Sequence, residues 1–250
     1  MIRVGLLGGG FMGETHASVY KKMAGVKLTA VADRNQRKGI HLAARFGAKY
    51  FSDYQELLDA NVCDVVDICL PTHMHEDSIL AVVRRELHYL CEKPLTLSLE
   101  AADRIIAATR EAGVKAMVAQ VIRFWPEYKA IREALAGGNI GQPLAASATR
   151  LIAPPNWSDW FRDPALSGGS LFDLHIHDLD FVYSLLGSPQ SIYCSGIRGD
   201  GGGWDHVFTS LNYDGPGKPG GQLDDATGIP ASNGFPAERY SWLHRFPVLC

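Results

Sequence analysis

The sequence lacks the features that mark membrane-spanning, secreted and nucleic-acid-binding proteins. No apolar run approaches the ~18 residues that a membrane-spanning helix needs, so we expect no membrane partner. The 24 Lys and Arg residues nearly balance the 27 Asp and Glu residues, for a net charge of −3. This balance provides no basic surface for nucleic acid. A strand-like run begins at Ile2, so we also expect no secretory signal peptide.

Cysteine is scarce and shows no metal-binding or disulfide pattern. The five cysteines, Cys63, Cys69, Cys91, Cys194 and Cys250, never form a C-x-x-C pair. An odd, scattered set predicts neither a zinc scaffold nor a disulfide framework and indicates a reduced, cytoplasmic protein. With 46% hydrophobic and only 20% charged residues among 250, the composition excludes a disordered tail protein and supports one or two globular domains.

Strand and helix patterns alternate over residues 1–120. Near-continuous apolar runs separated by helical spacing predict a parallel sheet covered by helices on both faces, as in a doubly wound Rossmann domain of the α/β class. The expected strands are Ile2–Leu7, Lys27–Ala32, Val65–Leu70, His88–Cys91 and Lys115–Ala119, and the expected helices include 11–20, Gln36–Phe46, 53–58, His75–Arg85 and 98–111.

The pattern changes after residue 120. Helical spacing over Trp125–Leu135 and Leu174–Leu186 now combines with strand-like alternation, which predicts a smaller α+β domain over residues 121–214. The expected strands of this domain are Pro143–Leu151, Ile192–Ile197 and Val207–Tyr213.

A glycine-rich turn joins the first strand to the first helix. Gly8, Gly10 and Gly13 fit G-x-G-x-x-G, around Phe11 and Met12. In this setting the glycines permit a tight turn, a close approach of the pyrophosphate and close packing of helix on strand. Asp33 ends the second strand, where a carboxylate can bind the ribose hydroxyls of a dinucleotide.

The residues after the second strand also bear on the choice of cofactor. Asp33 would repel a 2′-phosphate, which favours NAD. Arg34 follows it and could pair with that phosphate, so NADP stays open as the alternative.

Two further segments carry candidate catalytic residues. Lys93, in Glu92-Lys93-Pro94, follows a strand at the carboxyl edge of the sheet, where α/β proteins bind ligands. Asp173 and His177 are four residues apart on an expected helix, so the carboxylate can orient the imidazole as a general base. The structural alternatives are an exposed lysine, an N-cap aspartate and an interior histidine.

The histidines also invite a metal-hydrolase reading, with His175, His177 and Asp178 as ligands and His73 and His75 nearby. Residues two apart on a helix point to different faces, and no further ligands stand at a recognisable spacing. We therefore expect no metal.

Taken together, the motifs resemble one family. G-G-G-F-M-G-E-T-H, A-D-R, C-L-P-T-H-M-H, C-E-K-P-L and G-G-S-L-F-D-L-H-I-H-D-L-D occur in this order. Over roughly residues 1–214 they resemble the glucose–fructose oxidoreductase and inositol dehydrogenase family of nicotinamide-dependent oxidoreductases. The resemblance implies hydride transfer at a secondary hydroxyl or carbonyl of a sugar, nucleotide sugar or cyclitol. It also implies assembly into a homodimer or homotetramer.

The resemblance also implies roles for single residues. Lys93 would assist substrate binding and proton transfer, Asp173 would orient His177, and His177 would be the acid/base. The implied cofactor contacts are Gly8, Gly10, Phe11, Met12, Gly13, Asp33, Arg34, Pro71, Thr72, His75, Glu92 and Lys93. The weaker substrate candidates are Gln120, Arg123, Trp157 and Trp160. A non-catalytic dinucleotide-binding or inactive relative is the alternative function.

The last segment differs from the rest in composition. Residues 215–250 hold six Gly and five Pro, and the family likeness fades after residue 214. We expect a reading-frame shift in or just before Gly220-Gly221, an irregular out-of-frame tail and an incomplete second-domain sheet with an exposed edge and apolar face.

The coding DNA tests this expectation directly. Read one base later from Gly221, one synonymous choice of codons yields Gly-Ser-Trp-Met-Met-Pro-Gln-Gly-Phe, which resembles a segment of the family. We expect sequencing of the gene to show this peptide followed by a further open stretch. A shifted frame without that peptide would contradict the frame-shift hypothesis.

Overall fold

The computed structural model describes residues 1–152, 159–199 and 201–213. Contacts divide the chain into two compact units, Met1–Ala119 and the part that begins at Gln120. The segment expected to be out of frame, residues 215–250, lies outside the described residues, as does Trp157. No helix in the described ranges is long and apolar enough to cross a bilayer.

The first unit is a six-stranded sheet in the order β3-β2-β1-β4-β5-β6, with every neighbouring pair parallel. This is the predicted doubly wound Rossmann arrangement. The strands are β1 (Ile2–Leu7), β2 (Val26–Ala32), β3 (Lys49–Phe51), β4 (Val65–Ile68), β5 (His88–Cys91) and β6 (Ala116–Val118). β3 was not predicted from the sequence, because its three residues are too few to show a strand pattern.

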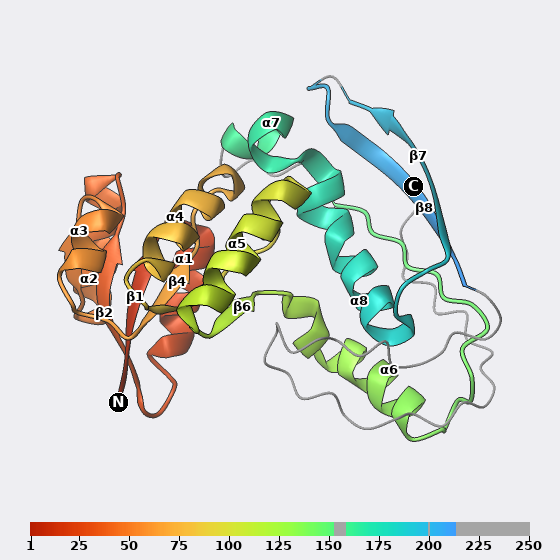
Figure 1. Cartoon of the computed structure of the whole chain (residues 1–250), viewed down its shortest axis with the longest axis horizontal. Coiled ribbons are helices and arrows are strands. Elements are labelled where there is room, and N and C mark those ends of the chain that lie inside the picture. The colour runs from red at the N-terminus through yellow and green to blue at the C-terminus, as the bar shows by residue number, and fades with distance from the viewer. Residues whose placement is uncertain (153–158, 200, 214–250) are drawn as a thin grey trace. The chain divides into compact units, whose positions relative to one another are not determined.

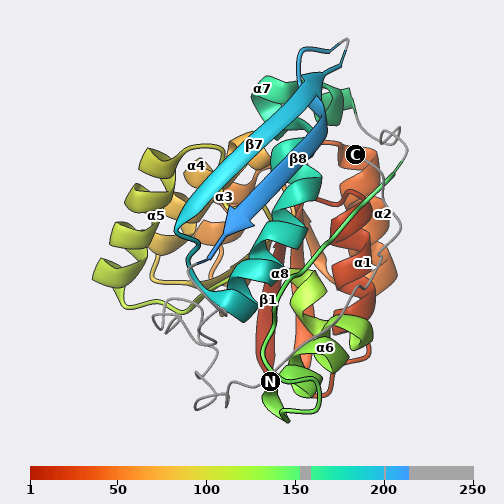
Figure 2. The same ribbon diagram turned by 90° about the vertical axis from the view of Figure 1, so that its right-hand side faces the viewer.

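Helices cover both faces of this sheet (Figures 1 and 2). The helices of this unit are α1 (Phe11–Tyr20), α2 (Gln36–Phe46), α3 (Tyr54–Asp59), α4 (His75–Val83) and α5 (Leu99–Ala112). Alternation along β1 places Leu6 in the core under α1 and α2, whereas Leu7 lies in the core under α3, α4 and α5. Because both faces are buried, the strands are mostly apolar.

Side-chain caps and glycines set where these helices begin and end. Asn35, Asp53 and Ser98 accept hydrogen bonds from the first turns of α2, α3 and α5. Gly47 and Gly113 end α2 and α5 in the left-handed conformation. The starts of α2, α3 and α5 and the ends of α2 and α5 therefore follow from local sequence.

The second unit contains α6 (Pro126–Ala136), α7 (Pro164–Ser167), α8 (Ile176–Leu186) and an antiparallel hairpin of β7 (Ser191–Arg198) and β8 (Trp204–Asn212). Short helical turns, η2 (Val121–Phe124), η3 (Asp159–Arg162) and η4 (Leu171–His175), precede α6, α7 and α8. Its small core holds Ile122, Tyr128 and Phe181, with the last two rings edge to face at 4.6 Å.

The expected strand Pro143–Leu151 is wrong, because the described residues of this segment form no strand. Alternating side chains favour an extended chain but do not provide a partner, and a ladder needs one. The β7–β8 hairpin pairs only with itself in the described sheet, and all eight residues of β7 are exposed.

The approach of α1 to β1 provides a stability test. A Cβ added to Gly13 would lie 1.9 Å from the Gly8 carbonyl oxygen, whereas one added to Gly10 would meet nothing within 4 Å. We expect Gly13→Ala to lower the free energy of unfolding by at least about 2 kcal/mol through overpacking. Gly10→Ala, the matched control, loses only a helix-cap preference of about 1 kcal/mol or less. Equal losses in urea unfolding would contradict this account.

Candidate functional site

The glycine-rich turn is shaped by two close backbone approaches. Gly8 has a φ of +95°, and a Cβ there would lie 2.6 Å from the Cys69 carbonyl oxygen on the neighbouring strand end. Gly13, on the first turn of α1, packs directly against the Gly8 carbonyl. Both positions therefore exclude side chains, and α1 begins immediately beside the end of β1.

Gly10 leaves the N-terminus of α1 open. It is exposed, it is the N-cap residue, and no side chain caps this helix. The space that a Cβ would enter holds no atom within 4 Å. Backbone N–H groups and the positive end of a helix dipole favour an anion at such a place. Phe11, 69% exposed, and Met12 follow at the same end.

Asp33 is tied to the glycine-rich turn. Its Oδ2 accepts a hydrogen bond from the Gly9 N–H at 2.7 Å, and its Oδ1 accepts one from the Asn35 N–H at 2.6 Å. These contacts orient the carboxylate at the carboxyl end of β2, beside the exposed side chain of Arg34. This is the position that the sequence analysis predicted for a ribose-binding acid.

The loops after β4 and β5 are joined by a buried histidine. His75 begins α4 and is only 1% exposed. Its Nδ1 lies 2.8 Å from the Pro94 carbonyl oxygen and its Nε2 lies 2.9 Å from the Leu70 carbonyl oxygen. Burial lowers the pKa of His75, against the opposing effect of these carbonyl contacts. Its side chain therefore packs between two loops, with buried Thr72 and half-buried Pro71 close by in sequence.

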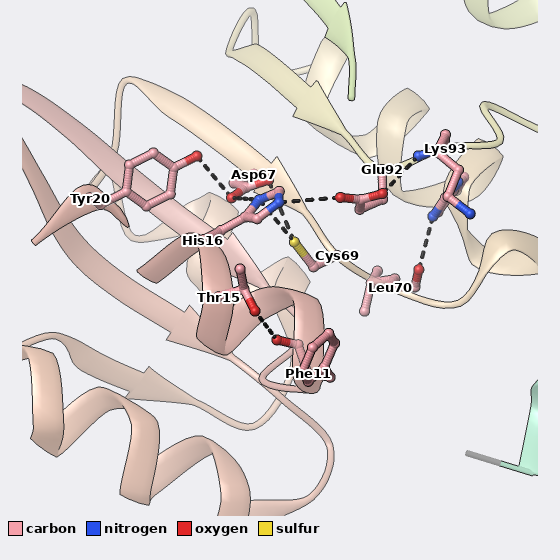
Figure 3. Close-up of polar contacts among 10 residues, drawn as sticks. Phe11, Thr15, His16, Tyr20, Asp67, Cys69, Leu70, Glu92 and Lys93 are labelled. Atoms are coloured by element: carbon pink, nitrogen blue, oxygen red, sulfur yellow. Dashed lines mark hydrogen bonds and ion pairs between the residues drawn. The ribbon is translucent and has the colours of Figure 1, made fainter. Parts of the chain in front are cut away.

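Lys93 follows β5 and is partly exposed, and its backbone N–H donates to Glu92 Oε2 at 3.1 Å. Glu92 is 9% exposed. Figure 3 shows the Glu92 carboxylate between Lys93 and the ring of His16 on α1. Glu92 was expected to contact the cofactor. In the structure its Oε1 faces His16 Nε2 and its Oε2 accepts the Lys93 N–H.

His16 belongs to a polar cluster that the sequence analysis missed. Its Nδ1 lies 2.8 Å from Asp67 Oδ2 and its Nε2 lies 3.2 Å from Glu92 Oε1. The Tyr20 hydroxyl donates to Asp67 at 2.9 Å, and Cys69 Sγ lies 3.5 Å from His16 Nδ1 (Figure 3). Asp67 was the available signal, because it is a charged residue inside a run that we interpreted as continuously apolar.

The cluster changes the acidity of its members. Desolvation alone would lower the pKa of His16, but hydrogen bonds to Asp67, Cys69 and Glu92 outweigh it and raise that pKa to about 12. Burial raises the pKa of Tyr20 and of the Cys69 thiol, and the Asp67 carboxylate adds to both shifts. The ring of His16 is therefore an imidazolium at neutral pH, and its thiol and phenol neighbours are uncharged.

In the second unit, Asp173 and His177 lie on consecutive helical turns. Asp173 is in η4, which is a π-helical turn, and His177 is in the first turn of α8. The structural alternative for Asp173, an N-cap, does not hold, because the chain is already helical at Ser170. π-Helical turns are rare and are frequent at functional sites, which is consistent with a site here.

A cavity of about 640 Å³ opens within the second unit. Asp173 lines it, whereas His177 is not among the lining residues. Its charged and polar lining includes Arg150, Arg162, Asp173, His175, Asp178 and His206.

The weaker substrate candidates have different environments. Arg123 is 8% exposed and binds Asp180 through two hydrogen bonds of 2.6 Å. The Trp160 ring stacks on Phe161 with centroids 4.0 Å apart. Gln120 Oε1 is buried without a hydrogen-bond partner among the described residues. An unpaired buried acceptor is costly, so Gln120 is the candidate here with capacity for a ligand donor.

The metal-hydrolase alternative named His175, His177 and Asp178 as ligands, and the contacts of His175 and Asp178 do not support it. His175 Nε2 lies 2.9 Å from the Thr209 hydroxyl, and Asp178 pairs with Arg150 at 2.8 Å. His16, Asp67 and Cys69 place three possible metal-ligand atoms within 4.8 Å of one another. Among the described residues, this is the one such set of at least three His, Cys, Asp or Glu side chains.

Two family models match the chain. One, described as an oxidoreductase family with an NAD-binding Rossmann fold, matches residues 2–120, and the other, described as a GFO/IDH/MocA C-terminal domain, matches residues 128–221. The sequence is 30% identical over 197 residues to myo-inositol 2-dehydrogenase of Thermotoga maritima. That match covers 78% of this chain and 58% of the relative, so the chain spans less than two thirds of that protein.

Solved structures are similar as well. GenD2 from gentamicin A biosynthesis, in complex with NAD, matches with a TM-score of 0.76 at 28% identity, covering 85% of this chain and 62% of that one. KijD10, a 3-ketoreductase from Actinomadura kijaniata in complex with NADP, matches with a TM-score of 0.71 at 26% identity, covering 78% and 60%.

The raised pKa of His16 predicts a pH dependence of stability. Since the folded pKa of about 12 exceeds the ordinary value of 6.5, its contribution is complete below about pH 6.5 and is lost as pH rises toward 12. We expect the free energy of unfolding to fall between pH 7 and 8.5 by at most about 1.4 kcal/mol per pH unit. His16→Gln removes this slope.

Denaturant unfolding at several pH values measures the effect. The lowered pKa of His75 acts in the opposite sense, with stability lost only as pH falls below about 6.5, so it does not interfere. A slope that His16→Gln leaves unchanged would contradict the assignment of His16 as an imidazolium.

Proposed function

The chain belongs to the Gfo/Idh/MocA oxidoreductase family, and from this membership we propose that it transfers hydride between a nicotinamide dinucleotide and a secondary hydroxyl or carbonyl of a sugar, nucleotide sugar or cyclitol. The observation that carries the proposal is the glycine-rich turn. Gly8 and Gly13 bring α1 against β1, while Gly10 leaves open the space that a Cβ would fill at the helix N-terminus.

NAD is the proposed cofactor. Its pyrophosphate would lie at the N-terminus of α1, and Asp33 would accept from its ribose hydroxyls. The Asp33 carboxylate is already oriented by Gly9 and Asn35, and its charge disfavours a 2′-phosphate. Arg34 is exposed beside it and keeps NADP as the second choice. A family structure with each cofactor is known, in GenD2 with NAD and KijD10 with NADP.

Three residues would carry the proton chemistry. His177 would take the hydroxyl proton as a general base, and Asp173, four residues earlier, would orient its ring. Lys93 would hydrogen-bond the reacting oxygen and stabilise the charge that develops there. The bound nicotinamide would supply the hydride acceptor. The reverse reduction would use the same groups.

The substrate class follows from relatives whose names include an inositol dehydrogenase and a 3-ketoreductase. These names support a secondary alcohol or ketone as the reacting group, and we propose that a polyhydroxylated ring carries it. Gln120, with its unpaired buried oxygen, would accept from a hydroxyl of such a ring.

A turnover assay with matched variants tests the proposal. We expect NADH formation at 340 nm from NAD and at least one compound in a panel of myo-inositol, monosaccharides and a nucleotide sugar. Lys93→Met and His177→Asn should each lower kcat about 100-fold, because a positioned acid/base group contributes at least this much. Lys129→Met, at an exposed lysine of α6, should leave kcat unchanged.

Cofactor binding is measured separately by quenching of NADH fluorescence. Gly10→Ala should weaken NADH binding at least about tenfold, because its methyl group enters the proposed phosphate space. Lys93→Met and His177→Asn should change it little. NADH binding without turnover on any substrate would support the non-catalytic alternative, and absence of binding would refute the proposal.

A further inference from the structure

His16 stands at the centre of a buried polar cluster that the proposed reaction leaves without a role. The residue lies on α1, three positions after Gly13, and its side chain is 16% exposed. Its two ring nitrogens face two different carboxylates, Asp67 on β4 and Glu92 after β5 (Figure 3). The ring therefore connects the helix of the proposed cofactor site to the ends of two neighbouring strands.

The Asp67 side of the cluster is an anchor. Asp67 is fully buried, and its Oδ2 also accepts a hydrogen bond from Tyr20, one helical turn beyond His16 on the same face of α1. Two side chains of one helix thus bind one carboxylate on β4. This arrangement fixes the height and rotation of α1 against the sheet.

The Glu92 side of the cluster reaches Lys93. Glu92 Oε1 lies 3.2 Å from His16 Nε2, and Glu92 Oε2 accepts the Lys93 backbone N–H at 3.1 Å. Because both oxygens of one carboxylate are used, its plane is fixed by two partners. The ring of His16 therefore holds the Glu92 carboxylate. That carboxylate in turn holds the backbone N–H of Lys93.

The arrangement requires a doubly protonated ring. A neutral imidazole has one N–H group and can donate to only one carboxylate, whereas an imidazolium donates to both. The raised pKa of His16 agrees with this hydrogen-bond count.

A metal ion held by His16, Asp67 and Cys69 is the competing interpretation of the same residues. The 2.8 Å between Nδ1 and Asp67 Oδ2 is an ordinary hydrogen-bond length, and Oδ2 also accepts from Tyr20. Nδ1 is thus already hydrogen-bonded, and Nε2 is paired with the Glu92 carboxylate. The geometry therefore favours the imidazolium.

We propose that His16 is a positioning residue that holds Glu92 and, through it, sets the direction in which Lys93 approaches the substrate. The inference rests on the role of Lys93 in the proposed function. The inference adds a link between two parts of the proposed site. The ring of His16 connects α1, which carries the proposed phosphate site, to Lys93, which would meet the reacting oxygen. Loss of this link misplaces Lys93 without removing it.

Two isosteric substitutions separate positioning from anchoring. In His16→Gln the amide nitrogen replaces Nε2 and keeps a donor toward Glu92, whereas in His16→Asn it replaces Nδ1 and keeps a donor toward Asp67. Positioning predicts that His16→Asn lowers kcat about tenfold or more, since displacements of about 1 Å can cost up to 100-fold. His16→Gln should retain most of the activity. Anchoring alone predicts the reverse order.

Tyr20→Phe is the matched control. It removes one hydrogen bond between α1 and Asp67 without touching Glu92. We expect it to lower thermal stability while leaving kcat and its pH profile unchanged. NADH fluorescence titration and circular dichroism on the full chain verify that each variant is folded, and we expect the NADH dissociation constants to stay within about threefold of one another.

A second measurement does not depend on turnover. Competitive acetylation with acetic anhydride, followed by peptide mass spectrometry, reports the reactivity of the Lys93 amine relative to Lys129. We expect His16→Asn to change the Lys93 rate at least about twofold and His16→Gln to leave it near that of the parent protein. If the parent protein shows no turnover but this pattern holds, the proposed function fails and the positioning role stands.

Two results would overturn the positioning role. One is that His16→Asn performs as well as or better than His16→Gln in both kcat and Lys93 labelling, since equal behaviour gives Glu92 no special part and the reverse order leaves His16 an anchor only. The other is binding of one zinc ion per chain that Cys69→Ser abolishes and Cys194→Ser does not, because a metal-bound Nδ1 cannot donate to Asp67.

Discussion

The close packing of α1 against β1 is the constraint on which the candidate site depends. Gly13 meets the Gly8 carbonyl directly, and no side chain fits between them. This contact sets where α1 begins, and therefore where its N-terminal N–H groups point. It also sets the distance from the sheet at which His16 and Tyr20 reach Asp67. One backbone contact thus places both the open N-terminus of α1 and the buried ion-pair cluster.

The cluster places charged side chains in the interior of a domain whose two cores are otherwise apolar. Burial of Asp67 would be costly without partners, and two donors from α1 supply them. Paired buried charges are weak contributors to net stability. We attribute to this cluster the precision of the strand ends, and to the two apolar cores on the faces of the sheet most of the stability.

The parts of the fold that sequence reasoning predicted are those with strong local causes. Long apolar strands, capping residues such as Ser98 and the spaced glycines each act within a few residues. The errors have equally definite causes. β3 is too short to show a period, and Pro143–Leu151 alternates in sequence but has no partner in the described sheet. Asp173 was expected to begin a helix that in fact starts earlier, through a π-helical turn.

By itself the sequence determined the class of the first unit, the glycine-rich turn, the acid that follows β2 and the candidate pair of Lys93 and His177. Only the tertiary structure decided that His16 joins Asp67, 51 positions away, to Glu92. The physical reason is strand order. With β1, β4 and β5 adjacent in the sheet, their carboxyl ends meet beneath α1, and no local pattern encodes which side chains come together there.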